Sequence, residues 1–209
     1  MATRMSAKTR AAWMRRLHQW HWVSSALCLV GMLAFAITGI TLNNAAHIEA
    51  TPQVRQVQTV LPEAMRLSLS TAADTAPDAP LPAAAADWIR QTMAVDVHDR
   101  AVEWSDDEAY VSLPRPGGDA WLSIDRAAGT VEYERTDRGW IAYFNDLHKG
   151  RHTGTAWSWF IDVFSLACVV FCLTGLVLLK LHGKHRPATW PVVGTGALIP
   201  LLLALLLIH

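Results

Sequence analysis

The sequence contains few charged residues and few cysteines. Only 17% of its 209 residues are Asp, Glu, Lys or Arg, whereas a soluble domain usually carries about 25%. Its three cysteines, Cys28, Cys168 and Cys172, all lie in apolar stretches, so the polar part of the chain holds no pair that could form a disulfide. Cysteine in an apolar stretch usually behaves as a small hydrophobic residue. The composition therefore favours a membrane protein whose polar part is not stabilised by disulfides.

Several motifs of catalysis and nucleic-acid binding are missing. The chain has no nucleophile elbow, no HExxH, no glycine-rich phosphate loop and no CxxC. The spacing of Cys168 and Cys172 is helical, and an apolar helix is a poor place for a metal cluster. Nucleic-acid binding would require a basic stripe on a soluble domain. The polar stretch 45–154 is instead acidic, with seventeen acids against ten basic residues, which excludes that function class.

Three apolar stretches are long enough to cross a bilayer, which takes about 20 residues of helix. They predict transmembrane helices at 22–44, 155–181 and 189–209, the last with Pro191 and Pro200. The competing interpretation of the first stretch is a cleaved signal peptide, but signal h-regions span only about 7–15 residues. Because 22–42 contains no charge at all, a retained helix is favoured.

Basic residues predict the orientation of these helices, because short loops rich in Lys and Arg stay in the cytoplasm. Residues 1–21 carry five basic residues and no acid, and the loop 182–188 adds Lys184 and Arg186. The N-terminus is therefore predicted to be cytoplasmic. In an inner membrane, residues 45–154 and the C-terminus would be periplasmic.

The polar stretch 45–154 is predicted to fold as a small α+β domain inserted between the first two transmembrane helices. A short helix could start in 61–69, 74–82 has the composition of a loop, and 83–93 that of a helix. Short runs of β-forming residues, separated by turn signals, predict a meander of strands. These runs are 94–97, 101–104, 109–113, 120–124 and 130–134.

Four short motifs, in order around the first two apolar stretches, resemble those of PepSY-associated transmembrane proteins. Leu17-His18-Gln19-Trp20 opens the first helix, which ends in Thr38-Gly39, and Leu147-His148 introduces a second helix that ends in Thr174-Gly175. Between them, Asp125-Arg-Ala-Ala-Gly129 is similar to the DxxxG turn of PepSY domains. The resemblance covers about 17–181. It implies a PepSY-like domain, and a relationship to haem-containing membrane reductases of iron and siderophores, some of them flavin-linked.

Eight of the nine histidines lie in or beside the predicted membrane segments, and only His98 lies well inside the polar domain. Three pairs have the spacing of residues that share a helix face, so both members of a pair could contact the same neighbour. These pairs are His18 and His21, His148 and His152, and His182 and His185. His47 and His209 stand alone. Each could be an ordinary interfacial residue, yet their concentration at the membrane flanks favours a shared role.

Imidazole is a common axial ligand of haem iron. One b-type haem could lie between His18 or His21 and His182 or His185, near the cytoplasmic face. A second could lie between His148 or His152 and His47, with His209 a weaker partner. Arg16 and Arg151 could neutralise haem propionates, although ordinary interfacial charge is the simpler explanation. Gly31, Gly39 and Gly175 would permit close approach of a macrocycle or, equally, of another helix.

Asp162 is the one acid inside a predicted span, and intramembrane acids are functional candidates by default. It could exchange protons or orient His152, although a hydrated position near the interface would explain it as well.

The sequence leaves three functions open. The first is a haem-b electron-transfer component that passes electrons outward to a ferric chelate, a siderophore or a flavoprotein, either as a membrane oxidoreductase or as its cytochrome subunit. The second is a non-enzymatic, membrane-anchored PepSY module that binds or regulates a partner outside the cytoplasm. The third is transition-metal sensing or transfer through His98 and the outer histidines. The expected partners are the lipid bilayer and a redox partner protein or a second copy of the chain.

Overall fold

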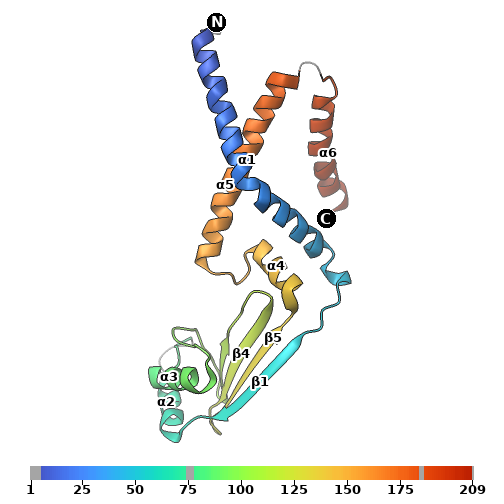
Figure 1. Cartoon of the computed structure of the whole chain (residues 1–209). Coiled ribbons are helices and arrows are strands. Elements are labelled where there is room, and N and C mark those ends of the chain that lie inside the picture. Colours follow the sequence, from blue (N-terminus) through green and yellow to red (C-terminus); the bar gives the residue numbers. More distant parts are fainter. Residues whose placement is uncertain (1–5, 74–77, 184–185, 209) are drawn as a thin grey trace. The chain divides into compact units, whose positions relative to one another are not determined.

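The computed structural model describes residues 6–73, 78–183 and 186–208. The chain divides into two compact units, each described by itself below: Met1–Ala34 with Trp159–His209, and Phe35–Ser158. The described part of the first unit consists of helices and the short segments that flank them, and the second unit contains the sheet (Figure 1).

Three helices are long and apolar enough to cross a membrane, as predicted: α1 (Ala7–Asn43), α5 (Thr155–His182) and α6 (Thr189–Leu207). Helix α1 begins fifteen residues before the predicted apolar span at 22, because residues 7–21 contain no proline or glycine to stop it. The Ser6 side chain accepts a hydrogen bond from the backbone N–H of Thr9 at 3.2 Å at this end. The basic N-terminal segment is thus largely a polar extension of the first helix.

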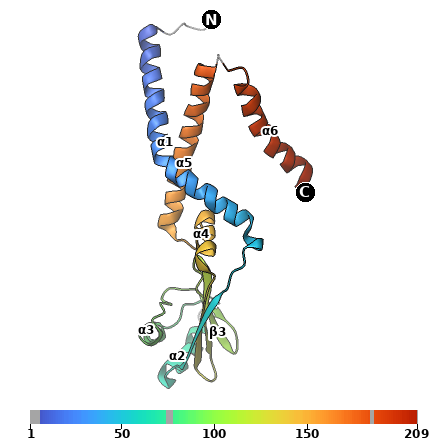
Figure 2. The same ribbon diagram turned by 45° about the vertical axis from the view of Figure 1, so that its right-hand side comes forward.

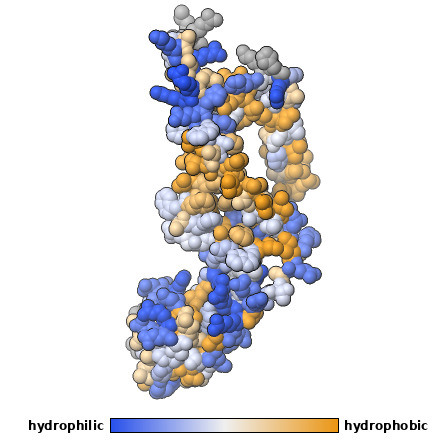
Figure 3. Space-filling model, viewed as in Figure 1, coloured by the Kyte–Doolittle hydropathy of each residue, from blue (hydrophilic) through white to orange (hydrophobic). Residues whose placement is uncertain are grey.

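The surface of helices α5 and α6 is largely apolar. On α5 and α6 no residue of the described part is buried, although both helices consist mainly of Leu, Val, Ile, Phe and Ala. Figure 3 shows hydrophobic residues covering the visible face of these helices. In water so large an exposed apolar surface would be costly, whereas hydrocarbon is the solvent in which it is stable.

Helices α1 and α5 approach each other closely at Gly31. A Cβ atom at this position would lie 2.3 Å from Cε2 of Phe164, so only glycine leaves room for the ring. Cys28, one turn earlier on α1, is fully buried. Small residues at a helix contact allow the backbones to pack tightly in membranes, and this is the role that the structure gives to Gly31.

The second unit contains a five-stranded antiparallel sheet in the order β1-β5-β4-β3-β2. Its strands are β1 (Gln53–Val60), β2 (Glu103–Trp104), β3 (Glu108–Ser112), β4 (Gly118–Asp125) and β5 (Thr130–Asp137). Two helices, α2 (Glu63–Ala73) and α3 (Ala83–Met93), connect β1 to the rest of the sheet. Both lie on one side of it (Figures 1 and 2). The short 3₁₀ helix η1 (Ala45–His47) precedes β1, and helix α4 (Gly139–Lys149) follows β5.

The hydrophobic core lies between this sheet and the two connecting helices. Strand β4 alternates strictly, with Ala120, Leu122 and Ile124 buried and the residues between them more exposed. Leu122 and Ile124 belong to one cluster with Leu69 of α2 and Ile89 of α3. The prediction of a small α+β domain between the first two long helices is confirmed.

The turn that resembles the PepSY signature is built as its sequence suggests. The carboxylate oxygen Oδ1 of Asp125 accepts hydrogen bonds from the backbone N–H groups of Ala127 and Ala128, at 2.8 and 2.7 Å. Gly129 has φ +71°, a left-handed conformation that glycine adopts without strain. Its N–H donates to the Asp125 carbonyl at 2.8 Å and closes the turn between β4 and β5.

Several predicted elements are corrected by the structure. The predicted strand at 94–97 does not form, because Ala94 ends α3 with φ +57° and Asp99 also has a positive φ of 54°. The predicted strand at 101–104 is reduced to Glu103–Trp104. Strand β1 and helix α4 were not predicted, and β1 turns the expected meander into a sheet whose last strand pairs with its first. Of the predicted loop 74–82, residues 74–77 lie outside the described part, and 78–82 form neither helix nor strand.

Candidate functional site

Two of the predicted haem ligands face each other in the helical unit. His18 lies in the polar first part of α1, and His182 is the last residue of α5. Their ring centres are 5.8 Å apart and their planes are inclined by 77°. Two imidazoles that each bind one metal atom at roughly 2.0–2.1 Å would have ring centres roughly 6 Å apart. The observed separation is therefore compatible with a single metal atom between the two rings.

Backbone hydrogen bonds orient both rings of this pair. Nδ1 of His18 lies 2.8 Å from the carbonyl oxygen of Met14, and Nδ1 of His182 lies 3.0 Å from that of Leu178. Because a carbonyl can only accept, each Nδ1 carries the proton and each Nε2 keeps a free lone pair. A hydrogen bond from the second ring nitrogen to a carbonyl is the arrangement that prepares histidine as a metal ligand.

His21 is held in a socket on α5, one helical turn from His18. Its Nδ1 lies 3.0 Å from Oγ1 of Thr174, and its ring stacks on Phe171 with ring centres 4.9 Å apart and planes inclined by 13°. The next residue, Gly175, leaves room for the ring, since a Cβ there would lie 3.3 Å from Cε1 of His21. The Thr174 hydroxyl donates to the Val170 carbonyl at 2.7 Å, so it accepts from His21. Nε2 of His21 is thereby also left unprotonated.

A second socket of the same design lies in the other unit. Nδ1 of His148, on α4, lies 2.7 Å from Oγ1 of Thr38. The His148 ring packs against Phe35, with ring centres 5.0 Å apart. Gly39 leaves room for the ring, since a Cβ at this position would lie 3.6 Å from Cε1 of His148. Both sockets thus have the pattern Phe-x-x-Thr-Gly, at Phe35–Gly39 on α1 and at Phe171–Gly175 on α5. Each receives a histidine that lies far from it in the sequence.

The predicted outer haem site needs His152 or His47 beside His148, and neither is placed there in the described part of the chain. His148 and His152 do not share a helix face, because α4 ends at Lys149 and His152 follows in a turn with φ +57°. Nε2 of His152 accepts a hydrogen bond from Nε of Arg151 at 3.1 Å. His47 lies exposed in η1, and no hydrogen bond or ring contact of the described residues joins it to either histidine. The expectation that the second transmembrane helix carries this ligand pair is wrong, since His148 belongs to the separate helix α4.

A groove of about 810 Å³ lies beside His21 and His182, within the helical unit. His21, Phe171 and Gly175 form part of its wall, and His182, Gly183 and Arg186 line it further along. Most of the remaining lining is Leu, so the groove is apolar with a few polar groups. Its volume falls within the range of roughly 300–1,000 Å³ typical of cofactor and ligand sites.

The remaining predicted residues make no comparable site. Asp162 is exposed on α5, and no side-chain hydrogen bond or ion pair of the described residues involves its carboxylate. In the sheet unit, His98 lies between two carboxylates, with Nδ1 2.8 Å from Asp96 and Nε2 3.3 Å from Asp87. No group of three or more His, Cys, Asp or Glu placed to hold a metal ion occurs in the part of the chain that is described. His185 and His209 lie outside that part.

Sequence reasoning did not identify the threonines as partners of the histidines. Thr38-Gly39 and Thr174-Gly175 were visible as motifs, but the residues that they contact are 110 and 153 positions away. The repeated spacing of Phe, Thr and Gly was the one available signal.

Comparison with known proteins identifies the family to which this chain of long apolar helices and a small inserted sheet domain belongs. The family model described as "Putative PepSY_TM-like" matches residues 12–209. The chain therefore belongs to the PepSY-TM-like family, as its motifs suggested. No curated protein and no solved structure matches it.

Proposed function

We propose that the chain is a haem-b electron-transfer component of a membrane, in which His18 and His182 would hold one haem. The observation that carries the proposal is the facing pair of imidazoles, each with Nδ1 bonded to a carbonyl and Nε2 available. Haem iron supplies one-electron chemistry when bound, which the side chains of this protein lack.

The surroundings of the pair suit a flat apolar macrocycle that carries carboxylates. The groove beside His182 is lined mainly by leucines and by the glycines Gly175 and Gly183. Arg186, at the same groove, could neutralise propionates. Arg186 is preferred to Arg16 as the counter-charge of this haem, because Arg186 lines the groove and Arg16 does not. His21, held by Thr174 and Phe171, is proposed as a wall of the site and not as a ligand.

The proposal includes one haem within a single chain. A second haem near His148 remains a prediction. In the part of the chain that is described, His148 is the one imidazole there with an open Nε2. A second copy of the chain could provide the other ligand. Electron transfer to an acceptor outside the cytoplasm, such as a ferric chelate, siderophore or flavoprotein, is part of the same proposal.

The test is a visible spectrum of the purified protein, reduced with dithionite minus oxidised, together with pyridine-haemochrome quantitation. We expect a sharp α-band and about one haem per chain. His18→Ala and His182→Ala should each abolish the band, whereas His21→Ala should retain it. His98→Ala is the matched control, because His98 lies in the sheet unit and is occupied by Asp87 and Asp96.

A colourless, well-folded protein from haem-replete cells would refute the haem. The chain would then be better explained as a membrane-anchored PepSY module that binds a partner. If His21→Ala lost the band while His18→Ala kept it, the ligand assignment alone would move to His21.

We further propose that the N-terminus is cytoplasmic and that the sheet unit lies outside the cytoplasm, because basic residues concentrate before the first span and between the second and third. The native cysteines can be replaced, after which Thr9→Cys and Asp107→Cys report on the two sides. A membrane-impermeant maleimide should label Asp107→Cys in intact cells, and Thr9→Cys only after lysis. The reverse pattern would invert the orientation.

A further inference from the structure

The face of the sheet that carries the hydrophobic core changes character along its length. Directly opposed residues of neighbouring strands share a face, so the register defines successive rows across β1, β5 and β4. The rows Thr59–Val131–Ile124 and Val57–Tyr133–Leu122 belong to the apolar end. The next rows, Arg55–Arg135–Ala120 and Gln53–Asp137–Gly118, are dominated by polar and charged residues.

Two arginines pair with one carboxylate at this polar end, and a third arginine lines the same depression. Nη2 of Arg115 lies 3.4 Å from Oδ2 of Asp137, and Nη2 of Arg135 lies 4.0 Å from the same oxygen. Arg55 stands directly opposite Arg135 in the register and lines the same depression of about 360 Å³ with Asp137. Three positive charges and one negative charge leave a net charge of +2 in a stretch whose net charge is −7.

The positive charges of this cluster are not balanced by its one carboxylate, and one of its hydrogen-bond donors has no partner. Like charges directly opposed on neighbouring strands are destabilising, and Asp137 is shared between two guanidinium groups. Its other oxygen, Oδ1, already accepts the backbone N–H of Gly139 at 2.9 Å. Nη1 of Arg115 is buried and has no hydrogen-bond partner. Unsatisfied buried donors are rare, and each calls for an explanation such as a missing ion.

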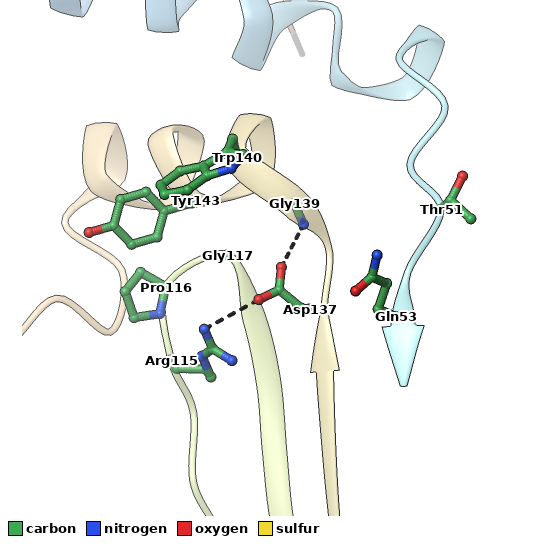
Figure 4. A pocket seen from close by; sticks show the side chains of 9 residues that line it. All are labelled: Thr51, Gln53, Arg115, Pro116, Gly117, Asp137, Gly139, Trp140 and Tyr143. Atoms are coloured by element: carbon green, nitrogen blue, oxygen red, sulfur yellow. Dashed lines mark hydrogen bonds and ion pairs between the residues drawn. The ribbon is translucent and has the colours of Figure 1, made fainter. Parts of the chain in front are cut away.

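Aromatic side chains border the charged cluster. A cavity of about 500 Å³ is lined by Arg115, Asp137 and Gln53 together with Trp140 and Tyr143 of α4. Figure 4 shows the two rings on one side of this cavity and the Arg115–Asp137 pair on the other. Trp140 is 75% exposed, which leaves its ring available to a ligand.

We infer that these two depressions, which share Gln53 and Asp137 and are here together called the arginine bay, bind a phosphate monoester whose organic part contains a flat ring. Arg115, Trp140 and Tyr143 line the larger depression, and Arg55 and Arg135 line the smaller one. A net charge of +2 matches a phosphate monoester, which carries about −1.5 to −2 at pH 7, better than a single carboxylate. Guanidinium groups bind phosphate oxygens in bidentate fashion. The ring of the ligand would pack against Trp140 and Tyr143.

The test is calorimetric titration of the full-length protein in detergent with three probes: phenyl phosphate, inorganic phosphate and benzoate. We expect phenyl phosphate to bind most tightly and benzoate most weakly. Arg55→Gln and Arg135→Gln should each weaken phenyl phosphate roughly tenfold or more, as expected for the loss of a charge-assisted hydrogen bond. Arg90→Gln is the matched control, since Arg90 is an exposed arginine paired with Asp87 outside the bay.

Trp140→Ala separates the two parts of the ligand. It should weaken phenyl phosphate several-fold and leave inorganic phosphate unchanged. Folding is checked independently by thermal unfolding without ligand, where Arg135→Gln should be no less stable than the wild type because it removes a repulsion. Phosphatidic acid in nanodiscs carries a phosphate monoester without a ring, so it should compete with phenyl phosphate no better than inorganic phosphate does.

Equal binding of benzoate and phenyl phosphate would overturn the assignment of a dianion. Equal affinity of Arg135→Gln and the wild type for phenyl phosphate would overturn the site itself.

Discussion

His21 donates a hydrogen bond from Nδ1 to Oγ1 of Thr174, 3.0 Å away and 153 positions later in the sequence. The same contact recurs between His148 and Thr38 at 2.7 Å. In each case a phenylalanine three residues before the threonine packs on the imidazole, and a glycine after it leaves room for Cε1. A segment of α1 and a segment of α5 thus carry the same docking site for a histidine.

Removing the threonine hydroxyl of one socket should destabilise the protein. Thr174→Val keeps the shape of the side chain but leaves the imidazole N–H of His21 without an acceptor, at a cost of about 1–3 kcal/mol. For a chain of this size, each kcal/mol lowers the melting temperature by about 2–4 °C. Thermal unfolding in detergent measures the change. Thr195→Val is the control, because the Thr195 hydroxyl bonds only to the Pro191 carbonyl of its own helix; equal effects of both variants would mean that the His21 contact contributes nothing.

The contact between Gly31 and Phe164 predicts a second effect on stability. A methyl group at Gly31 would meet the ring at 2.3 Å, so Gly31→Ala should force α1 and α5 apart or displace the ring. Such overpacking costs about 1–3 kcal/mol, although alanine alone favours the helix by about 1 kcal/mol over glycine. Gly196→Ala, on α6 with nothing within 4 Å of its would-be Cβ, should be neutral or stabilising. A melting temperature of Gly31→Ala at or above that of Gly196→Ala would contradict the close packing.

The DxxxG turn should depend on the Asp125 oxygen and not on its charge. Asp125→Ala removes the acceptor for two backbone N–H groups, and the loss of such a cap typically costs about 0.5–2 kcal/mol. Asp125→Asn retains a carbonyl oxygen at the same place and should recover most of the stability. Chemical denaturation followed by circular dichroism tests this. If Asp125→Asn were as unstable as Asp125→Ala, charge would be the stabilising property instead.

The sequence predicted those parts of the fold whose signals are local. The three long helices, α3 and the turn at Asp125–Gly129 follow from apolar length, composition and turn chemistry. Strand β1 was missed because its valines, at 54, 57 and 60, do not alternate with period two and it lies at the edge of the sheet. Its stability comes from pairing with β5, some seventy residues later, which no local pattern reveals.

Of the candidate sites, the sequence predicted one histidine pair but not the arginine bay. His18 and His182 were proposed as partners from topology, and the structure places their rings edge to face, with centres 5.8 Å apart. The spacing of His148 and His152 suggested one helix, but Gly150, with φ +66°, ends α4 between them. The arginine bay was not foreseen, because Arg55, Arg115 and Arg135 come together only through the strand register and the loop before β4.

Alkaline pH should destabilise the sheet unit through Tyr110. Burial raises the pKa of this phenol above its ordinary value of 10.0, and the nearby carboxylates of Glu103 and Glu108 raise it further. Because the folded state favours the neutral form, this contribution to stability is complete below the unfolded pKa and is lost as pH rises through the folded pKa. Stability measured from pH 9 upward should therefore fall more steeply in the wild type than in Tyr110→Phe. Tyr133→Phe, which leaves Tyr110 in place, should retain the steep fall, and identical profiles for Tyr110→Phe and the wild type would show that another group controls the alkaline transition.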